Sequence, residues 1–178
     1  MKETEKTALE FRPARPEETE AVVGFYTEVI EQMQVSPYHP TWIMGIYPTA
    51  DFLSEAVRRQ EIYLAQLHGE TVGAMLLNHA CNENYGGLHW GREAPAAEVL
   101  ILHLLCVLPK HWGKGCAKEM LRFLLRHAAE TGQKAVRFDA MEGNLPARQL
   151  YERMGFTCVD TVQMYYESTG WTGFSLYY

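Results

Sequence analysis

The stretch Leu100–Gly132 constrains the fold more than any other part of the chain. Its first part, Leu100–Leu108, is almost entirely apolar, which is typical of a strand covered on both faces. Pro109 ends this strand because proline has no N–H to give to a ladder. After a glycine-containing turn, apolar residues recur at the spacing of one helix face until Gly132, a natural stop. The stretch therefore predicts a buried strand, a tight turn and an amphipathic helix.

The turn before this helix has the composition of an anion-binding site. Glycines let the backbone approach a ligand and adopt positive φ, and the N–H groups of a helix's first turn point outward at the positive end of its dipole. The turn is not a dinucleotide fingerprint, since Lys118 stands where a third glycine is required. It is not a Walker phosphate loop either, since Cys116 follows Gly115. By themselves the residues allow both a pyrophosphate site, with Lys114 at its rim, and a glycine turn without a ligand.

Length and composition favour one globular domain. The chain has 178 residues, of which 47% are hydrophobic and 21% charged, enough for a sizeable core. We expect a flexible tail over residues 1–8 and a single domain over residues 9–178. The net charge of −6 and the absence of a Lys/Arg run argue against nucleic acid as a partner and suit a cationic substrate such as an amine.

The cysteines and the amino terminus indicate a reducing compartment. Cys81, Cys106, Cys116 and Cys158 form no C-x-x-C pair and no short-spaced metal set, and we predict no metal. The amino terminus is polar and lacks an apolar signal core. No apolar run approaches the ~20 residues that span a bilayer. We therefore expect a cytoplasmic protein with free thiols and no membrane partner.

The rest of the chain predicts strands and helices on both sides of the central unit. Two segments are expected as loops: Val35–Pro48, rich in proline and aromatic residues, and residues 81–97, polar and exposed. The end of the chain, Gln163–Glu167 and Thr172–Tyr178, is expected as one long strand interrupted by a bend. The remaining strands are expected at Leu9–Pro13, Ile62–Leu67, Thr71–His79, Ala135–Ala140 and Phe156–Thr161, and helices at Glu17–Met33, from Thr49 or Asp51 to Gln60, and at Leu145–Met154.

The last of these helices carries a second motif. Asn144 is a good N-cap, and Gly155 stops the helix before Phe156 begins the next strand. Together the two motifs resemble those of the GCN5-related N-acetyltransferases (the GNAT family), and the resemblance covers about residues 98–160. The first resembles V-x-P followed by Q/R-x-x-G-x-G/A, and the second resembles N-x-x-A-x-x-x-Y-x-x-x-G-F. The matching residues are Val107, Pro109, Gly113, Lys114, Gly115, Cys116 and Ala117 in the first and Asn144, Ala147, Tyr151, Gly155 and Phe156 in the second.

The resemblance implies an α/β (α+β) fold with a mixed sheet that is flanked by helices and splayed between two central strands. Acetyl-CoA is then the co-substrate and lies in the split, with its pantetheine arm beside the strand and its pyrophosphate on the N–H groups of the glycine turn. Trp112 departs from the family's Gln or Arg, which removes a phosphate donor unless the indole N–H replaces it. Asn144 contacts the cofactor arm, caps its helix, or does both. The implied cofactor-binding residues are Leu105, Cys106, Val107, Trp112, Gly113, Lys114, Gly115, Cys116, Ala117, Lys118 and Asn144.

Three residues are candidates for the chemistry. Tyr151 matches the family tyrosine near the thioester sulfur, where its O–H can protonate the departing thiolate; the alternative is a core tyrosine. His103 resembles in position a histidine base of the arylalkylamine branch, and Glu98 at the start of the strand is the rival base. The alternatives are a core histidine and an exposed carboxylate. Strict alternation predicts that His103 shares a face with Ile101, Leu105 and Val107.

These features predict an acetyl-CoA-dependent N-acetyltransferase that acts on a primary amine of a small molecule or peptide by direct attack in a ternary complex. Cys106 and Cys116 have no base partner in the sequence, which disfavours a covalent acyl carrier. The alternative from another class is an acyl-CoA- or CoA-binding sensor with little or no turnover. We expect Tyr38, Trp42 and Trp171 to line the acceptor pocket, and the aromatic end Trp171–Tyr178 would allow a homodimer.

Overall fold

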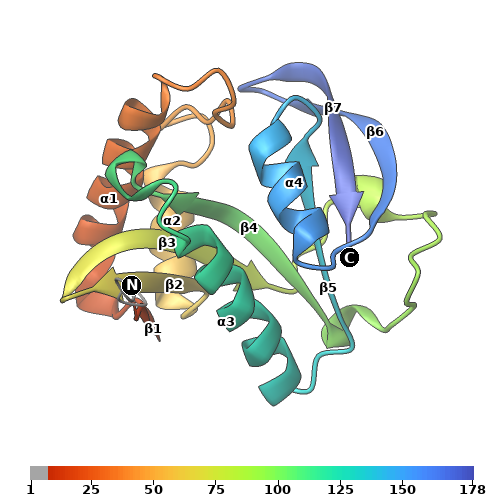
Figure 1. Cartoon of the computed structure of the whole chain (residues 1–178), viewed down its shortest axis with the longest axis horizontal. Coiled ribbons are helices and arrows are strands. Elements are labelled where there is room, and N and C mark those ends of the chain that lie inside the picture. Colours follow the sequence, from red (N-terminus) through yellow and green to blue (C-terminus); the bar gives the residue numbers. More distant parts are fainter. Residues whose placement is uncertain (1–7) are drawn as a thin grey trace, which may run out of the picture.

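A seven-stranded mixed sheet runs through the molecule in the order β1-β2-β3-β4-β5-β7-β6, as Figure 1 shows. The computed structural model describes residues 8–178, so the expected tail lies outside the described residues except for its last position. Within these residues four α-helices flank the sheet. The elements are β1 (Glu10–Pro13), α1 (Thr19–Met33), α2 (Ala50–Arg58), β2 (Ile62–Leu67), β3 (Glu70–Asn78), β4 (Val99–Val107), α3 (Cys116–Glu130), β5 (Ala135–Met141), α4 (Leu145–Arg153), β6 (Cys158–Tyr166) and β7 (Gly170–Tyr177).

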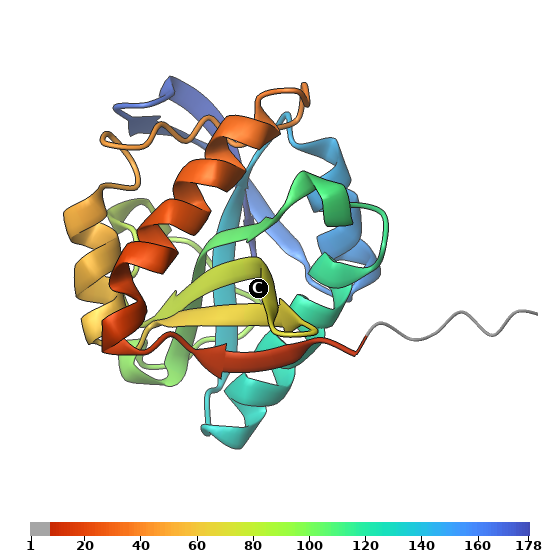
Figure 2. The ribbon, with the colours of Figure 1, turned by 90° about the vertical axis from the view of Figure 1, so that its left-hand side faces the viewer.

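The helices cover the two faces of the sheet in pairs. The apolar stripe of α1 packs with α2 on one face, and the stripe of α3 packs with α4 on the other, as Figures 1 and 2 show from two sides. Helix α2 begins at Thr49, whose hydroxyl accepts the Phe52 N–H at 3.0 Å. Thr49 is therefore the N-cap, which resolves the choice that the sequence left between Thr49 and Asp51.

The sheet opens between its two central strands. β4 and β5 run parallel and pair from Val99–Ala135 to Ile101–Arg137. Beyond this point β5 pairs with β7 instead, through Phe138–Met141. This divergence confirms the mixed, centrally splayed sheet that the resemblance implies.

A β-bulge in β4 lies at the point where the strands diverge. Leu104 has φ +50°, and Ala74 pairs with Cys106 while Leu76 pairs with His103, so two residues of β4 oppose one of β3. The fully buried Tyr26 of α1 donates its hydroxyl hydrogen to the Leu104 carbonyl at 3.0 Å. This hydrogen bond satisfies a carbonyl that the bulge removes from the regular ladder.

The bulge reverses which face each β4 side chain takes. Leu105 and Val107 pack on the α3 side of the sheet, whereas Leu104 and Cys106 pack on the α1 side. The expectation that His103 shares a face with Leu105 and Val107 is therefore wrong, because alternation restarts after the extra residue.

Two other expectations need correction. The end of the chain is not one bent strand: β6 and β7 form an antiparallel hairpin along their whole length. The chain turns over residues 167–169 and enters β7 at Gly170, whose φ is +68°. The loop over residues 81–97 is not wholly exposed, because Tyr85 and Trp90 are buried. The Arg137 guanidinium of β5 lies over the Trp90 ring, 4.4 Å from its centroid. A local pattern does not show either of these long-range contacts.

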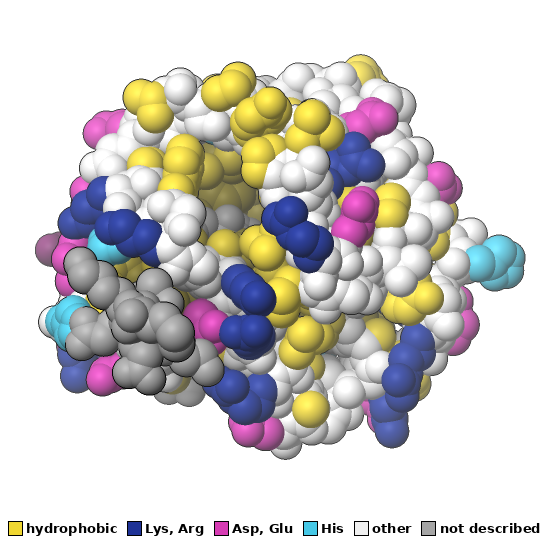
Figure 3. Space-filling view, in the orientation of Figure 1, with side chains coloured by type: hydrophobic (Ala, Val, Ile, Leu, Met, Phe, Trp, Pro, Cys, Tyr) yellow, Lys and Arg dark blue, Asp and Glu magenta, His cyan; other side chains and the backbone are white. Residues whose placement is uncertain are grey.

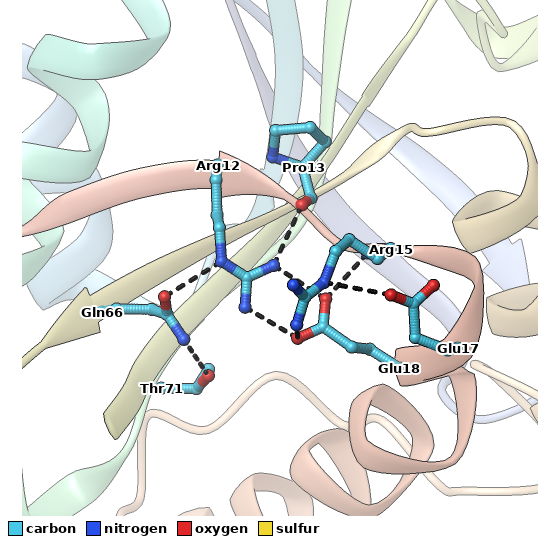
Figure 4. Close-up of polar contacts among 7 residues, drawn as sticks. All are labelled: Arg12, Pro13, Arg15, Glu17, Glu18, Gln66 and Thr71. Carbon is cyan, nitrogen blue, oxygen red and sulfur yellow. Dashed lines mark hydrogen bonds and ion pairs between the residues drawn. The ribbon is translucent and has the colours of Figure 1, made fainter. Parts of the chain in front are cut away.

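A polar network joins the edge strand to the start of the first helix (Figure 4). Arg12 of β1 donates two hydrogen bonds of 2.7 Å to the Glu18 carboxylate, and its Nε donates to Gln66 Oε1 on β2 at 3.0 Å. Glu18 also accepts the Arg15 backbone N–H at 2.8 Å. The hydrogen bonds from Arg12, opposed by partial burial, lower the pKa of Glu18 to about 2.

We predict that Glu18→Gln lowers the free energy of unfolding at pH 7 by about 1–2 kcal/mol, the value of a partly exposed bidentate ion pair. Because the folded-state pKa is depressed, this contribution is present above the unfolded pKa of about 4.3. It is lost as pH falls toward 2. Urea unfolding at pH 7 and pH 3 measures it. Glu17→Gln, at an exposed ion pair, is the control, and equal losses in both variants would contradict the prediction.

We also predict that Tyr26→Phe costs about 1–3 kcal/mol of stability, because it leaves the buried Leu104 carbonyl without a donor. Thermal and urea unfolding measure the loss. Tyr38→Phe, at an exposed tyrosine, is the control and should change stability by less than about 0.5 kcal/mol. A Tyr26→Phe variant as stable as this control would show that the bulge does not depend on the hydroxyl.

Candidate active site

The opening between β4 and β5 forms a cavity of about 690 Å³. In Figure 3 it appears as a hollow floored by hydrophobic side chains, with Lys and Arg side chains gathered along one side. Its walls come from both central strands, the segment after α1, the amino-terminal turn of α3, α4 and the β6–β7 hairpin. Because these walls come from both sides of the sheet, the cavity connects its two faces.

One wall is a row of unpaired backbone donors. Gly115, with φ +82°, is the N-cap of α3, and no side chain caps this helix. Within residues 8–178, none of the N–H groups from Gly113 to Lys118 donates a hydrogen bond to another residue. The helix dipole and the exposed Lys114 and Lys118 add positive potential here. The turn thus has the free donors that a pyrophosphate requires.

The open edge of β4 presents further backbone groups to the cavity. The Leu108 N–H donates to Val72 on β3 at 2.9 Å, so alternation directs the backbone groups of Val107 away from β3 and toward the split. The Val107 carbonyl accepts the Trp112 indole N–H at 2.8 Å. The indole therefore closes the end of the strand, and its N–H is not free to replace the phosphate donor of the family motif. Leu105, Cys106 and Val107 all line the cavity.

Tyr151 of α4 lies in the cavity with its ring packed edge-on against Phe138, 4.6 Å between centroids. Its hydroxyl has no hydrogen-bond partner within the described residues. Burial, the largest cause, and the nearby Asp139 raise the pKa of Tyr151 well above its ordinary value. Tyr151 therefore keeps its proton at neutral pH. Asn144 also lines the cavity while its side chain accepts the Ala147 N–H at 3.4 Å, so it caps α4.

His103 lines the cavity as a neutral imidazole. Asn78 Oδ1 accepts the Ala80 backbone N–H at 3.0 Å, which fixes the amide orientation. The same oxygen lies 3.0 Å from His103 Nε2, so Nε2 carries the proton and Nδ1 keeps its lone pair. Burial lowers the pKa of His103 to about 4. The imidazole is therefore available as an acceptor but is a weak base.

The structure places two of the expected residues away from the cavity. Glu98 precedes β4 at the end where β4 and β5 are still paired, and it is not among the lining residues. Trp171 lies on β7, is 73% exposed and packs on Tyr165. Tyr38 and Trp42 do line the cavity. The homodimer through the aromatic end of the chain stays a prediction.

Sequence reasoning missed Asp139, the one carboxylate among the described lining residues. It lies in β5, a strand otherwise apolar except for Arg137. Burial raises its pKa, and a hydrogen bond from the Tyr85 hydroxyl opposes this rise. The available signal was an acidic residue in the middle of a strand expected to be buried.

The cysteines of the site are not activated. Burial raises the pKa of Cys106 to about 12 and also raises the pKa of Cys116, so both are thiols rather than thiolates at neutral pH. Among the described residues no cluster of His, Cys, Asp and Glu has the arrangement of a metal site. None of the helices described over residues 8–178 has the length and apolarity to cross a membrane.

Comparisons with known proteins agree with this geometry. The family model "Acetyltransferase (GNAT) family" matches residues 19–156. No curated protein matches the chain significantly. Several solved structures share the fold at low sequence identity.

A GNAT-family acetyltransferase of Listeria monocytogenes 4b F2365 is 21% identical, with a TM-score of 0.72 over 95% of this chain and 92% of that one. A GNAT-family acetyltransferase of Streptococcus pneumoniae is 17% identical, with a TM-score of 0.69 over 96% and 98%. Arabidopsis thaliana NAA60, solved in complex with acetyl-CoA, is 17% identical, with a TM-score of 0.66 over 96% and 97%. The chain belongs to the GNAT acetyltransferase family.

Proposed function

We propose that this protein is an acetyl-CoA-dependent N-acetyltransferase that acts on a primary amine of a small molecule or peptide by direct attack in a ternary complex. One observation carries the proposal: the turn whose N–H groups are unpaired from Gly113 to Lys118 and the side chain of Tyr151, whose hydroxyl is free, both line one cavity between the splayed strands. The acetyl-CoA complexes of Arabidopsis NAA60 and Salmonella typhimurium yncA, which share the fold, support this choice of co-substrate.

The residues present fit acetyl-CoA. The N–H groups from Gly113 to Lys118 would hold its pyrophosphate, with Lys114 and Lys118 as counter-charges. The cleft-side backbone of Leu105 and Val107 would pair with its pantetheine arm as a neighbouring strand would. Since Trp112 supplies no phosphate donor, backbone amides carry this part of the affinity.

Bound acetyl-CoA would supply an acetyl thioester, whose carbonyl carbon the amine attacks as the C–S bond breaks. Tyr151 holds a proton at its phenolic oxygen and can give it to the departing thiolate. The phenol regains a proton from the amine nitrogen, which loses one on becoming an amide. Unactivated Cys106 and Cys116 favour direct attack over a covalent acyl-enzyme.

Of the two bases expected from the sequence, His103 is the one that the cavity can use. Its neutral imidazole lines the cavity, although burial, opposed by a backbone hydrogen bond with Ala80, lowers its pKa to about 4 and limits its strength as a base. Glu98 would act only through a chain of water molecules, because it precedes the paired end of β4. We therefore propose His103 as an orienting acceptor rather than as the main base.

We predict that Gly115→Ala weakens acetyl-CoA binding about tenfold. Its φ of +82° costs a residue with a side chain about 1–2 kcal/mol, so the turn moves away from the geometry that presents its N–H groups. Calorimetric titration measures the affinity. Gly132→Ala, with φ +73° near the other end of α3, is the matched control and should leave the affinity unchanged. Equal weakening in both variants would mean that the turn is not the binding site.

We predict that Tyr151→Phe lowers kcat by about 100-fold or more, the usual size of a lost general acid, while the acetyl-CoA affinity stays the same. A thiol-release assay with a panel of amines, amino acids and peptides measures turnover. Tyr177→Phe, whose ring packs 5.5 Å from that of Tyr151, is the control and should keep its turnover. Unchanged kcat in Tyr151→Phe would remove Tyr151 from the mechanism. Acetyl-CoA binding without turnover of any acceptor would instead favour a sensor.

A further inference from the structure

We infer, on the basis of the proposed acetyl transfer, that Asp139 binds the acceptor as a protonated amine and takes up its proton, and that the acceptor has no carboxylate beside the amine. Three observations carry this inference: the register of β4 and β5, the environment of the carboxylate, and the distribution of charge along the cavity.

The register of the two central strands places Asp139 at the base of the split. Ile101 and Arg137 are the last residues to pair. His103 and Asp139 each follow two residues later on parallel strands, so both lie on the same face of the sheet. Phe138, on the opposite face, packs against Tyr151. The carboxylate therefore reaches the cavity from the face opposite α3 and α4.

The carboxylate of Asp139 is oriented but has no counter-charge. The Tyr85 hydroxyl donates to Oδ2 at 2.7 Å. Oδ1 has no partner, and no Lys or Arg lies within ion-pair distance of Asp139 in the part of the chain that the structure describes. A largely buried carboxylate with a single hydrogen bond destabilises the fold. Because Asp139 lines the cavity, a cationic ligand there could bind Oδ1 and supply the missing counter-charge.

The wall beside Asp139 is aromatic. The rings of Tyr47 and Tyr166 stack with centroids 6.2 Å apart, and Phe174 packs edge-on against Tyr166 at 5.2 Å. All three line the cavity. Aromatic faces together with one carboxylate form a favourable environment for an organic ammonium ion on an apolar body.

Charge along the cavity excludes a second negative group at this end. The described lining residues with a permanent positive charge are Lys118 and Arg153, which belong to α3 and α4, on the side of the turn that would hold the pyrophosphate. A carboxylate adjacent to the amine would lie near Asp139 with no cation of the cavity wall to pair with, because the Arg137 guanidinium lies over Trp90 and Arg137 does not line the cavity. The geometry thus favours amines over the corresponding amino acids.

The proton balance is complete with these groups. The ammonium gives one proton to Asp139, which becomes a neutral carboxylic acid, and the free amine forms the N–C bond as the C–S bond breaks. Tyr151 protonates the thiolate, and the second proton passes from the nitrogen to the Tyr151 phenolate as the amide forms. Burial raises the pKa of Asp139 and lowers that of His103, so burial strengthens Asp139 as a proton acceptor and weakens His103.

Matched substrates test the specificity with the wild-type protein. Phenethylamine and phenylalanine differ by one carboxylate, as do 3-methylbutylamine and leucine. We expect kcat/KM for each amine to exceed that for its amino acid by at least about 100-fold, the cost of an unpaired buried charge. Equal turnover of amine and amino acid in both pairs would overturn the inference while leaving the proposed acetyl transfer intact.

The isosteric Asp139→Asn variant tests the residue itself. We expect kcat/KM for phenethylamine to fall about 100-fold or more, with unchanged affinity for acetyl-CoA. Tyr85→Phe, which loosens the orientation of the carboxylate, should raise KM with a smaller effect on kcat. Asp139→Asn activity within threefold of wild type would refute the role of Asp139 without touching the proposed function.

Two further readouts separate a functional role from a structural one. Since the pKa of Asp139 is raised in the fold, its ionised form destabilises the protein above the unfolded pKa. Asp139→Asn should therefore keep or raise Tm at pH 7, and a large fall in Tm would indicate a structural role instead.

The second readout is the pH dependence of the wild-type enzyme. As pH is lowered, kcat/KM should fall with an apparent pKa above that of an ordinary aspartate. This carboxylate raises the pKa values of Tyr47, Tyr85, Tyr151 and Tyr166. His103 and Arg137 are further titratable groups on its face of the two central strands.

A binding measurement without turnover separates failure of the amine site from failure of the proposed acetyl transfer. In the presence of CoA, phenethylamine should raise the Tm of the wild type and not that of Asp139→Asn. If neither amine is acetylated and phenethylamine still stabilises only the wild type, the proposed transfer fails and the amine site stands. If phenethylamine does not stabilise the wild type, the amine site is refuted.

Discussion

The divergence of β4 from β5 after Ile101 and Arg137 is the constraint on which the site depends. Separating two strands inside a sheet leaves backbone donors and acceptors without their ladder partners, which is costly unless other groups satisfy them. The protein meets part of this cost itself: the Tyr26 hydroxyl binds the Leu104 carbonyl, and the Trp112 indole binds the Val107 carbonyl. The remaining backbone groups are available to a ligand. The same opening therefore creates the cavity and leaves the hydrogen-bonding groups that would bind a ligand in it.

The cavity joins two chemically different halves across the sheet. On the α3–α4 side, free N–H groups and cationic side chains suit an anionic co-substrate. On the other side, a carboxylate among tyrosine rings suits a cation. Tyr151 lies between them, packed on Phe138 and close enough to Asp139 for that carboxylate to raise its pKa. The anionic co-substrate would therefore bind on the α3–α4 side and the cationic acceptor on the side of Asp139, so each would occupy its own half of the cavity.

The residues that orient these groups come from segments far away in the sequence. Asn78 at the end of β3 fixes the proton of His103, and Tyr85 in the following loop fixes the carboxylate of Asp139. That loop is held by Trp90 under the Arg137 guanidinium. Its packing therefore serves the site, although none of its own residues lines the cavity. The Asp139 carboxylate, which these contacts orient, has no counter-charge and therefore costs stability. Such a local cost is expected at a site where a bound ligand supplies the missing charge.

The sequence by itself determined the parts of this protein that depend on neighbouring residues. The apolar run before Pro109, the glycine turn and the amphipathic helix fix one unit, and Asn144, Tyr151 and Gly155 fix the other, because capping, turn formation and helix periodicity act within a few residues. Two such units at this spacing were enough to indicate the family and the anion-binding turn.

Only the tertiary structure decided the rest. The bulge at Leu104 changes the face of every later β4 side chain, and it forms through pairing with β3 and contacts Tyr26, both far away in the chain. The position of Glu98 at the closed end of the split, the exposure of Trp171 and the entry of Asp139 into the cavity follow from strand register. Register is set by pairing between distant segments, and a one-residue shift moves a side chain to the opposite face of the sheet. The acceptor half of the site is therefore a property of the folded sheet rather than of any local motif.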